Sequence, residues 1–156
     1  MADQKLPMRL GVGIILLNTK NQVFVGKRRD NPGDKWQMPQ GGVENGEDFC
    51  TAMKRELQEE TGIKSIEVIK EIEQMYEYEL PKKLIGVIWK GKFKGQKQKW
   101  FIAQFIGNEN EINLNTKYPE FIEWKWIKVD ELPKVIVDFK KNLYLSLLKE
   151  IKLVID

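Results

Sequence analysis

Residues 41–63 read GGVENGEDFCTAMKRELQEETGI, and this stretch ends on a crowd of glutamates. Glu56, Glu59 and Glu60 are spaced by three and four positions, which places all three carboxylates on one face of an α-helix. Like charges held this close destabilise each other. The chain must therefore either spread these carboxylates into water or bring a cation to them.

The phase of the helix favours a cation. With about 100° between successive residues, Phe49, Ala52 and Met53 share the side that we expect to be buried, and the glutamates continue that side. The opposite, solvent-facing side carries Glu47, Thr51, Lys54 and Gln58. Oxygen-only ligands suit Mg²⁺ or Mn²⁺. We therefore interpret the acidic face as the floor of a metal-binding cleft, with a solvated acidic face as the alternative.

The two ends of this helix carry their own signals. Asn45 is a suitable N-cap, and Glu47 and Asp48 would place negative charge in the first turn. Gly62 suits the left-handed position that ends many helices. We therefore predict a helix over 46–61.

Composition narrows the class of protein. A chain of 156 residues with 42% hydrophobic and 31% charged residues predicts one globular domain over 1–156. No apolar run approaches the ~20 residues of a membrane helix, and the first residues lack a signal-peptide core, so we expect a cytoplasmic protein without membrane association. The absence of histidine excludes Ser-His-Asp and Cys-His catalysis and His-ligated zinc. Cys50 is the only cysteine, so no internal disulfide is possible.

Charge is distributed unevenly along the chain. Residues 44–79 hold eleven acids and four bases, a net charge of −7, whereas residues 80–108 hold seven lysines and no acid, a net charge of +7. An acidic metal site beside a basic segment suits a polyanionic substrate. Ordinary solvated lysines are the alternative.

The rest of the pattern alternates strands and helices. We predict strands at 9–17, 22–29, 65–80, 84–93, 97–106 and 124–129, the first two forming a hairpin, and an amphipathic helix at 140–151. This order predicts an α/β fold, an α/β/α sandwich with a mixed β-sheet.

The opening stretch also resembles the Nudix box. Gly41, five residues, Glu47, seven residues and then RELQEETGI at 55–63 fill all nine defining positions of the box. The resemblance implies the same sandwich fold and a metal-dependent hydrolase that uses water to cleave a phosphoanhydride.

Roles for the box residues follow from this resemblance. It implies that Glu56, Glu59 and Glu60 bind Mg²⁺ or Mn²⁺, more than one ion, with the backbone carbonyl of Gly41 as a further ligand. Arg55 would hold these ligands in place by pairing with Glu47 or a neighbouring glutamate. Gly42 and Gly62 complete the motif structurally.

Three segments outside the box are similar to a narrower group, the bacterial RNA 5′-pyrophosphohydrolases, also described as dinucleoside polyphosphate hydrolases. These segments are WQMPQGG at 36–42, GQKQKWF at 95–101, and Pro119-Glu120-Phe121 followed by Trp124 and Trp126. The resemblance implies either 5′-phosphorylated RNA, whose conversion to a monophosphate starts mRNA decay, or a dinucleoside polyphosphate as substrate. A non-catalytic regulator with this fold is a third reading, and the complete set of acids argues against it.

The narrower resemblance also assigns residues outside the box. It implies that Glu120 enters the metal site as ligand or base, and that Arg9 and Arg29 contact phosphate or nucleotide. A surface acid at Glu120 and surface charges at the two arginines are the alternatives.

Further substrate contacts are expected along the same groove. Phe139 resembles an aromatic residue that stacks on a base, with Lys140 beside it, and stacking combined with charge is a common way to hold unpaired RNA. Tyr78, Lys82 and Lys99 are further candidates. Phe139 could instead belong to the core.

Overall fold

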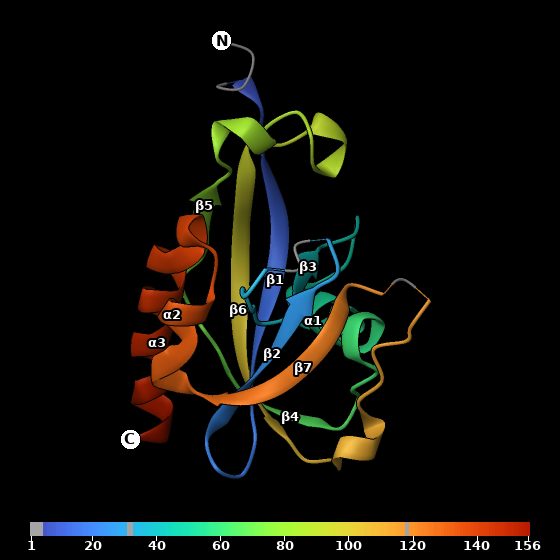
Figure 1. Ribbon diagram of the computed structural model, residues 1–156, viewed down its shortest axis with the longest axis vertical. Coiled ribbons are helices and arrows are strands. Elements are labelled where there is room, and N and C mark those ends of the chain that lie inside the picture. Colours follow the sequence, from blue (N-terminus) through green and yellow to red (C-terminus); the bar gives the residue numbers. More distant parts are fainter. Residues whose placement is uncertain (1–4, 31–32, 118) are drawn as a thin grey trace.

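A mixed β-sheet forms the middle of the molecule (Figure 1). The computed structural model describes residues 5–30, 33–117 and 119–156. Within these residues the sheet has seven strands: β1 (Met8–Leu17), β2 (Gln22–Arg28), β3 (Gln40–Gly42), β4 (Ile66–Glu71), β5 (Tyr76–Glu79), β6 (Gly95–Phe105) and β7 (Phe121–Lys128). The main path runs β4-β6-β1-β2-β7, while β3 pairs with β1 and β5 with β6. Strands β1 and β6 run parallel, and the other pairs are antiparallel.

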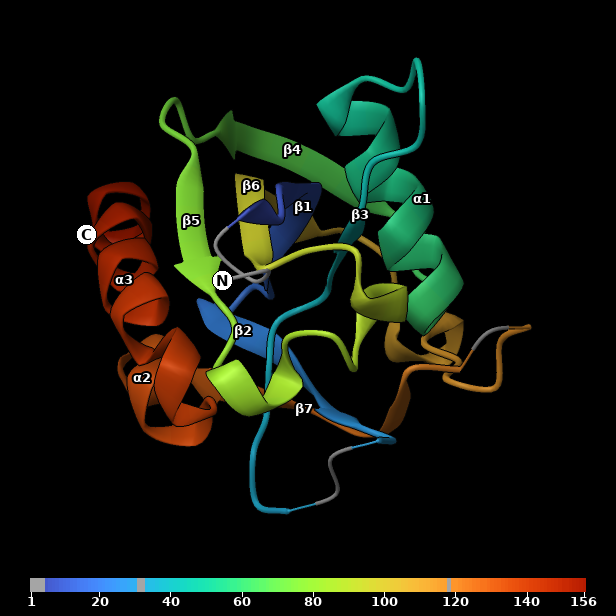
Figure 2. The same cartoon turned by 90° about the horizontal axis from the view of Figure 1, so that it is seen from above.

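Helices cover both faces of this sheet, as Figure 2 shows from above. Helix α1 (Phe49–Thr61) lies on one face, and α2 (Leu132–Val135) and α3 (Lys141–Ile155) lie on the other. The predicted α/β/α sandwich with a mixed sheet is confirmed.

Strand β1 is buried on both faces because its side chains alternate between two cores. Val12, Ile14 and Leu16 pack in the core that includes α1 residues. Ile15 and Leu17 pack in the core that includes α3 residues. This alternation explains why the strand reads as an unbroken apolar run, and it makes β1 the element from which both layers are positioned.

The start of α1 differs from the prediction. The helix begins after Asp48, whose side chain accepts the backbone N–H of Thr51 at 2.7 Å, so Asp48 and not Asn45 is the N-cap. Gly46 has a φ of 78°, a left-handed conformation that keeps the preceding loop out of the helix. Gly62 ends the helix with a φ of 75°, as predicted.

The predicted strand at 84–93 is wrong. This segment forms two 3₁₀ turns, η2 (Lys82–Leu84) and η3 (Trp89–Gly91). Gly86, Trp89, Lys90 and Gly91 all have positive φ, which no strand accommodates. The strand predicted at 65–80 is two strands, β4 and β5, that both pair with β6. The remaining strands and the terminal helix lie within a few residues of their predicted bounds.

Among the helices of the described residues, none is long and apolar enough to cross a lipid bilayer.

Gly13 tests how closely β1 packs. A Cβ at this position would lie 2.4 Å from the indole ring of Trp100, which is fully buried. We expect Gly13→Ala to lower the free energy of unfolding by about 1–3 kcal/mol through overpacking, as measured by urea denaturation. Gly33→Ala is the control, because a Cβ there meets nothing within 4 Å, and its change should stay within about 0.5 kcal/mol. Equal effects of the two substitutions would contradict this view of the core.

Candidate functional site

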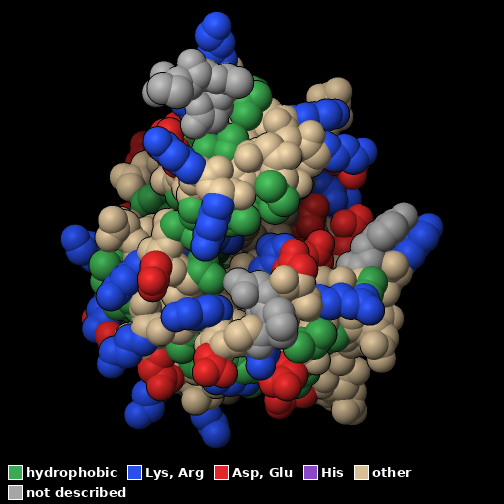
Figure 3. Space-filling view, turned by 45° about the horizontal axis from the view of Figure 1, so that its top comes forward, with side chains coloured by type: hydrophobic (Ala, Val, Ile, Leu, Met, Phe, Trp, Pro, Cys, Tyr) green, Lys and Arg blue, Asp and Glu red, His purple; other side chains and the backbone are tan. Residues whose placement is uncertain are grey.

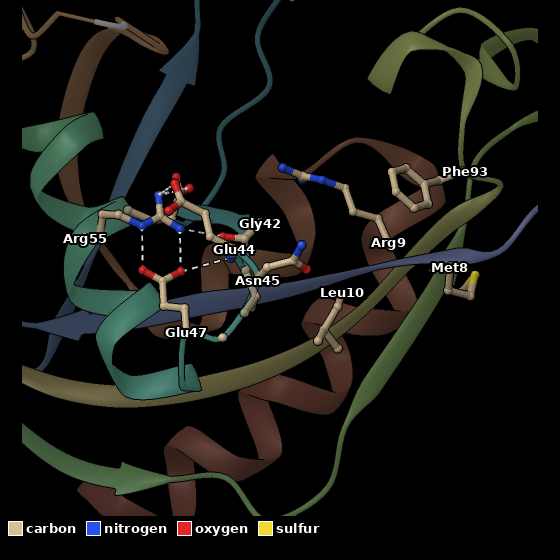
Figure 4. A pocket seen from close by; sticks show the side chains of 12 residues that line it. Met8, Arg9, Leu10, Gly42, Glu44, Asn45, Glu47, Arg55 and Phe93 are labelled. Carbon is tan, nitrogen blue, oxygen red and sulfur yellow. Dashed lines mark hydrogen bonds and ion pairs between the residues drawn. The ribbon is translucent and has the colours of Figure 1, made fainter.

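Arg55, in the middle of α1, is the centre of a hydrogen-bond cluster. Its guanidinium donates two bonds of 2.8 Å to the Glu47 carboxylate and one of 2.8 Å to the carbonyl of Gly42. It also bonds Glu56 at 2.8 Å and Glu59 at 3.3 Å. The predicted pairing of Arg55 with Glu47 is confirmed, and Figure 4 shows the Glu47 carboxylate facing one edge of the guanidinium and bonded to it. Arg55 thus ties the loop after β3 to the acidic face of the helix.

Charge pairing shifts the acid–base behaviour of these groups. The two hydrogen bonds from Arg55 lower the pKa of the Glu47 carboxyl to about 2, helped by a backbone bond with Glu44. The same bonds raise the pKa of Arg55. Both groups are therefore charged at neutral pH, and the clamp that they form is permanent under physiological conditions.

Glu60 lies at the bottom of the site. Its side chain is buried, and burial raises its pKa well above the ordinary value of a carboxyl, with the nearby charges of Glu56 and Glu120 acting in the same direction. A backbone hydrogen bond from Gln40 and the charge of Arg28 oppose this shift. Within the part of the chain that the structure describes, one carboxyl oxygen of Glu60, Oε2, is buried without a hydrogen-bond partner. A buried and unpartnered carboxyl oxygen is costly unless a further group meets it.

The burial and mutual repulsion of these acids are the chemistry that a divalent metal ion relieves. Glu56 is also half-buried, and burial raises its pKa although its bond to Arg55 acts against the shift. The closeness of Glu56, Glu60 and Glu120 raises the pKa of Glu60, and a divalent cation would remove that repulsion. As the described side chains stand, no three carboxylates converge on one point, and Arg55 engages Glu56 and Glu59 instead.

The paired glycines bring charged groups against the backbone. A Cβ on Gly41 would lie 2.0 Å from the carboxyl carbon of Glu56, and a Cβ on Gly42 would lie 2.4 Å from a guanidinium nitrogen of Arg9. A side chain at either position would push these charged groups away from the backbone.

Cationic and aromatic side chains surround the acids on the α3 side. Arg9 is half-buried; burial lowers the pKa of its guanidinium, whereas Glu56, Glu60 and Glu120 raise it. Lys140 is buried, which lowers the pKa of its amine to about 7, with the charge of Arg28 adding to the shift.

Two aromatic rings accompany Lys140. Its Nζ lies 5.1 Å from the ring centre of Tyr78 and 5.8 Å from that of Phe139, and the two rings are 5.9 Å apart. The hydroxyl of Tyr78 accepts hydrogen bonds from the amides of Gln40 and Gln96. Tyr78 is a buried member of the core cluster and Phe139 packs against the same cluster, so both rings are core residues that lie beside the charges of the site.

Arg29 does not lie where the sequence analysis predicted it. Arg29 is exposed, and its backbone N–H bonds the carbonyl of Glu120, while the side chain of Arg28 pairs with Asp30 at 2.6 Å and lies 4.0 Å from Glu120. The geometry therefore favours Arg28 over Arg29 as the arginine of the site.

Lys99 is separated from the rest of the site. It is buried, donates to the backbone carbonyl of Glu73 and pairs with Glu71 at 3.7 Å. These bonds fix it at the corner between β4 and β5, and strand alternation places it on the opposite face from Gln96 and Gln98.

Glu59 is exposed and contacts Arg55, away from the buried acids.

The site opens to solvent through a cavity of about 610 Å³. Its lining includes Arg9, Gly42, Arg55, Glu56 and Phe93 (Figure 4). Figure 3 shows acidic and basic side chains together around the hollow on this face. Opposite charges at one opening suit a ligand that carries both phosphates and counter-cations.

The clamp between Glu47 and Arg55 predicts a pH-dependent contribution to stability. Because the folded-state pKa of Glu47 lies below its ordinary value of 4.5, the contribution is present above pH 4.5 and is lost as the pH falls toward about 2. We expect Glu47→Gln to be less stable than the wild type at neutral pH, with the difference shrinking below about pH 4.5, as measured by urea denaturation across this range. Glu67→Gln, at an exposed position of β4, should show no such convergence, and a pH-independent difference for Glu47→Gln would contradict the assignment.

Comparison with known proteins agrees with this geometry. The family model of the NUDIX domain matches residues 7–147. An RNA pyrophosphohydrolase of Pelagibacter ubique (strain HTCC1062) is 54% identical over 158 residues, covering 100% of both chains. The RNA pyrophosphohydrolase of Rickettsia prowazekii (strain Madrid E) is 46% identical, covering 97% of this chain and 94% of its own.

Solved structures share the fold at lower identity. The E. coli dihydroneopterin triphosphate pyrophosphohydrolase has a TM-score of 0.68 at 21% identity, covering 92% of this chain and 97% of its own. A C. elegans Ap4A hydrolase has a TM-score of 0.65 at 18% identity, covering 92% and 96%. With a family model that spans most of its length and relatives near half identity, the chain belongs to the Nudix family.

Proposed function

We propose that this protein hydrolyses a phosphoanhydride bond at the 5′ end of triphosphorylated RNA in the cytoplasm, leaving a 5′-monophosphate and so starting mRNA decay. The observation that carries the proposal is the similarity, over nearly the full length of both chains, to proteins named RNA pyrophosphohydrolase. The site supports it, because buried carboxylates lie beside arginines, a lysine and two aromatic rings.

Nudix hydrolases generally act with divalent metal ions, and here we propose Mg²⁺ or Mn²⁺, with more than one ion. Glu56, Glu59, Glu60 and Glu120 would hold them together with the carbonyl of Gly41. Bound ions would polarise the phosphoryl oxygens and favour formation of hydroxide from water. Arg55 would keep its bonds to Glu47 and Gly42, and so hold the helix in register while its other carboxylate partners turn to the metal.

The cationic rim would bind the phosphates. Arg9 and Arg28 lie within electrostatic reach of Glu60 and Glu120, where they would neutralise phosphate oxygens that the metals leave free. The 5′ nucleotides would lie against Tyr78 and Phe139, with Lys140 beside both rings.

A dinucleoside polyphosphate is the second candidate substrate. The likeness in fold to a C. elegans Ap4A hydrolase motivates it, and the same carboxylates and arginines would serve a polyphosphate joined to two nucleosides. Comparing kcat/KM for triphosphorylated RNA and diadenosine tetraphosphate, at matched concentrations with Mg²⁺, separates the two. We expect RNA to be preferred, and preference for the dinucleotide would overturn RNA as the primary substrate.

Glu60→Gln tests the metal assignment. Because the buried carboxyl has a strongly raised pKa, the neutral amide should preserve the fold in the absence of metal. We expect kcat/KM to fall by about 100-fold or more, and Mg²⁺ or Mn²⁺ to raise the Tm of the wild type but not that of the variant. Activity within about tenfold of the wild type would overturn the role of Glu60.

A further inference from the structure

The connection between β5 and β6 has no role in the reaction proposed above. We call residues 81–94 the strap. In Figures 1 and 2 it caps one end of the β1–β6 pair and crosses from the side of α2 to the side of α1. It contains Lys82, Lys83, Lys90, Lys92 and Lys94 and no acidic residue.

The strap has a defined conformation. Leu84, Ile85, Ile88 and Trp89 pack against the core cluster that contains Tyr78 and α3 residues. Trp89 and Lys90 adopt positive φ, 52° and 57°, an arrangement that non-glycine residues rarely adopt without support from their surroundings. The packing of the apolar residues therefore fixes which way the lysines project.

The strap borders the catalytic cleft directly. The guanidinium of Arg9 lies 5.3 Å from the ring centre of Trp89, a cation–π contact. Phe93 lines the same cavity as Arg55 and Glu56 and packs edge-on against Trp89, with ring centres 6.2 Å apart. The strap therefore forms one edge of the opening of this cavity.

Most of the positive charge of the strap has no carboxylate partner among the described residues. Lys82, Lys83, Lys90 and Lys92 are exposed, and none of them forms an ion pair within the described part of the chain, whereas Lys94 pairs with Glu79 at 3.8 Å. Lys97 at the adjoining end of β6 is also exposed. Free lysines next to a polyanion site release counterions when a further phosphate binds to them.

We propose that the strap binds the phosphates of the RNA chain beyond the first nucleotides, and so favours RNA over short polyphosphate substrates. This inference rests on the proposed function and adds a second contact surface to it. The surface fits a single-stranded backbone, because lysines are point charges that neutralise phosphates without reading the bases.

The test compares substrates of two lengths. The strap variant Lys83→Gln/Lys90→Gln/Lys92→Gln retains Lys82, which is nearest to Tyr78 along the chain. The control Lys20→Gln/Lys64→Gln/Lys149→Gln removes the same charge at exposed positions outside the strap. We measure kcat/KM for a triphosphorylated dinucleotide RNA and for a triphosphorylated single strand of about sixteen nucleotides, at several salt concentrations.

We expect the strap variant to lose on the order of tenfold in kcat/KM for the long RNA at low salt, and little for the dinucleotide RNA. The slope of log(kcat/KM) against log salt for the long RNA should become shallower by about 0.7 for each lysine that contacts a phosphate. The control variant should retain the length preference of the wild type, and unchanged thermal unfolding of both variants would show that the fold is intact.

Two results would overturn the strap surface: equal behaviour of the strap and control variants, or an equal loss for both RNA lengths in the strap variant. Failure of the proposed function looks different, since the wild type would then turn over neither RNA. The two proposals are therefore tested separately.

Discussion

The site depends on one interaction, the grip of Arg55 on Glu47 and on the carbonyl of Gly42. Three hydrogen bonds of 2.8 Å from one guanidinium join β3 and the loop after it to the helix α1. Because Arg55 bonds both the backbone carbonyl of Gly42 and the carboxylate of Glu56, it sets the distance between the glycine backbone of β3 and the acidic face of α1. The carboxylates of Glu56 and Glu60 can then be buried near each other although they repel.

Burial acts in opposite directions on the two kinds of charge in the cleft. It raises the pKa of Glu60 and lowers that of Lys140, so each group is held in an environment that disfavours its ionised form. Under the proposed function, a phosphate chain accompanied by divalent cations would supply a partner to each: cations to the acids and phosphate oxygens to the amine. The proposed substrate complex would then stabilise both groups in their ionised forms.

The sequence predicts those features that depend on local spacing. The helix phase of 49–60 and the left-handed Gly62 follow from positions within one stretch, and the order of elements predicts the mixed sandwich. The pairing of Arg55 with Glu47 or a neighbouring glutamate was implied by the resemblance to the Nudix box. Features that depend on how distant segments meet were not predictable in this way. Whether Arg28 or Arg29 faces the site depends on the register between β2 and β7, in which Arg28 lies opposite Phe121. This register cannot be read from either segment alone. The position of Lys99 depends on the corner between β4 and β5, where its amine donates to a backbone carbonyl. The conformation of the strap depends on left-handed residues at 89 and 90, although its apolar composition favoured a strand.

The parallel pairing of β1 with β6 has a consequence for how the molecule is assembled. The two strands match residue for residue from Met8 with Gly95 to Leu17 with Gln104. The ribosome makes the chain from its amino end. More than half of the polypeptide must therefore be synthesised before β6 is available to pair with β1. Closure of so distant a pair carries a large entropic cost and slows folding. The helix α1 is thus made early, but the scaffold that buries Glu60 is completed only late in translation.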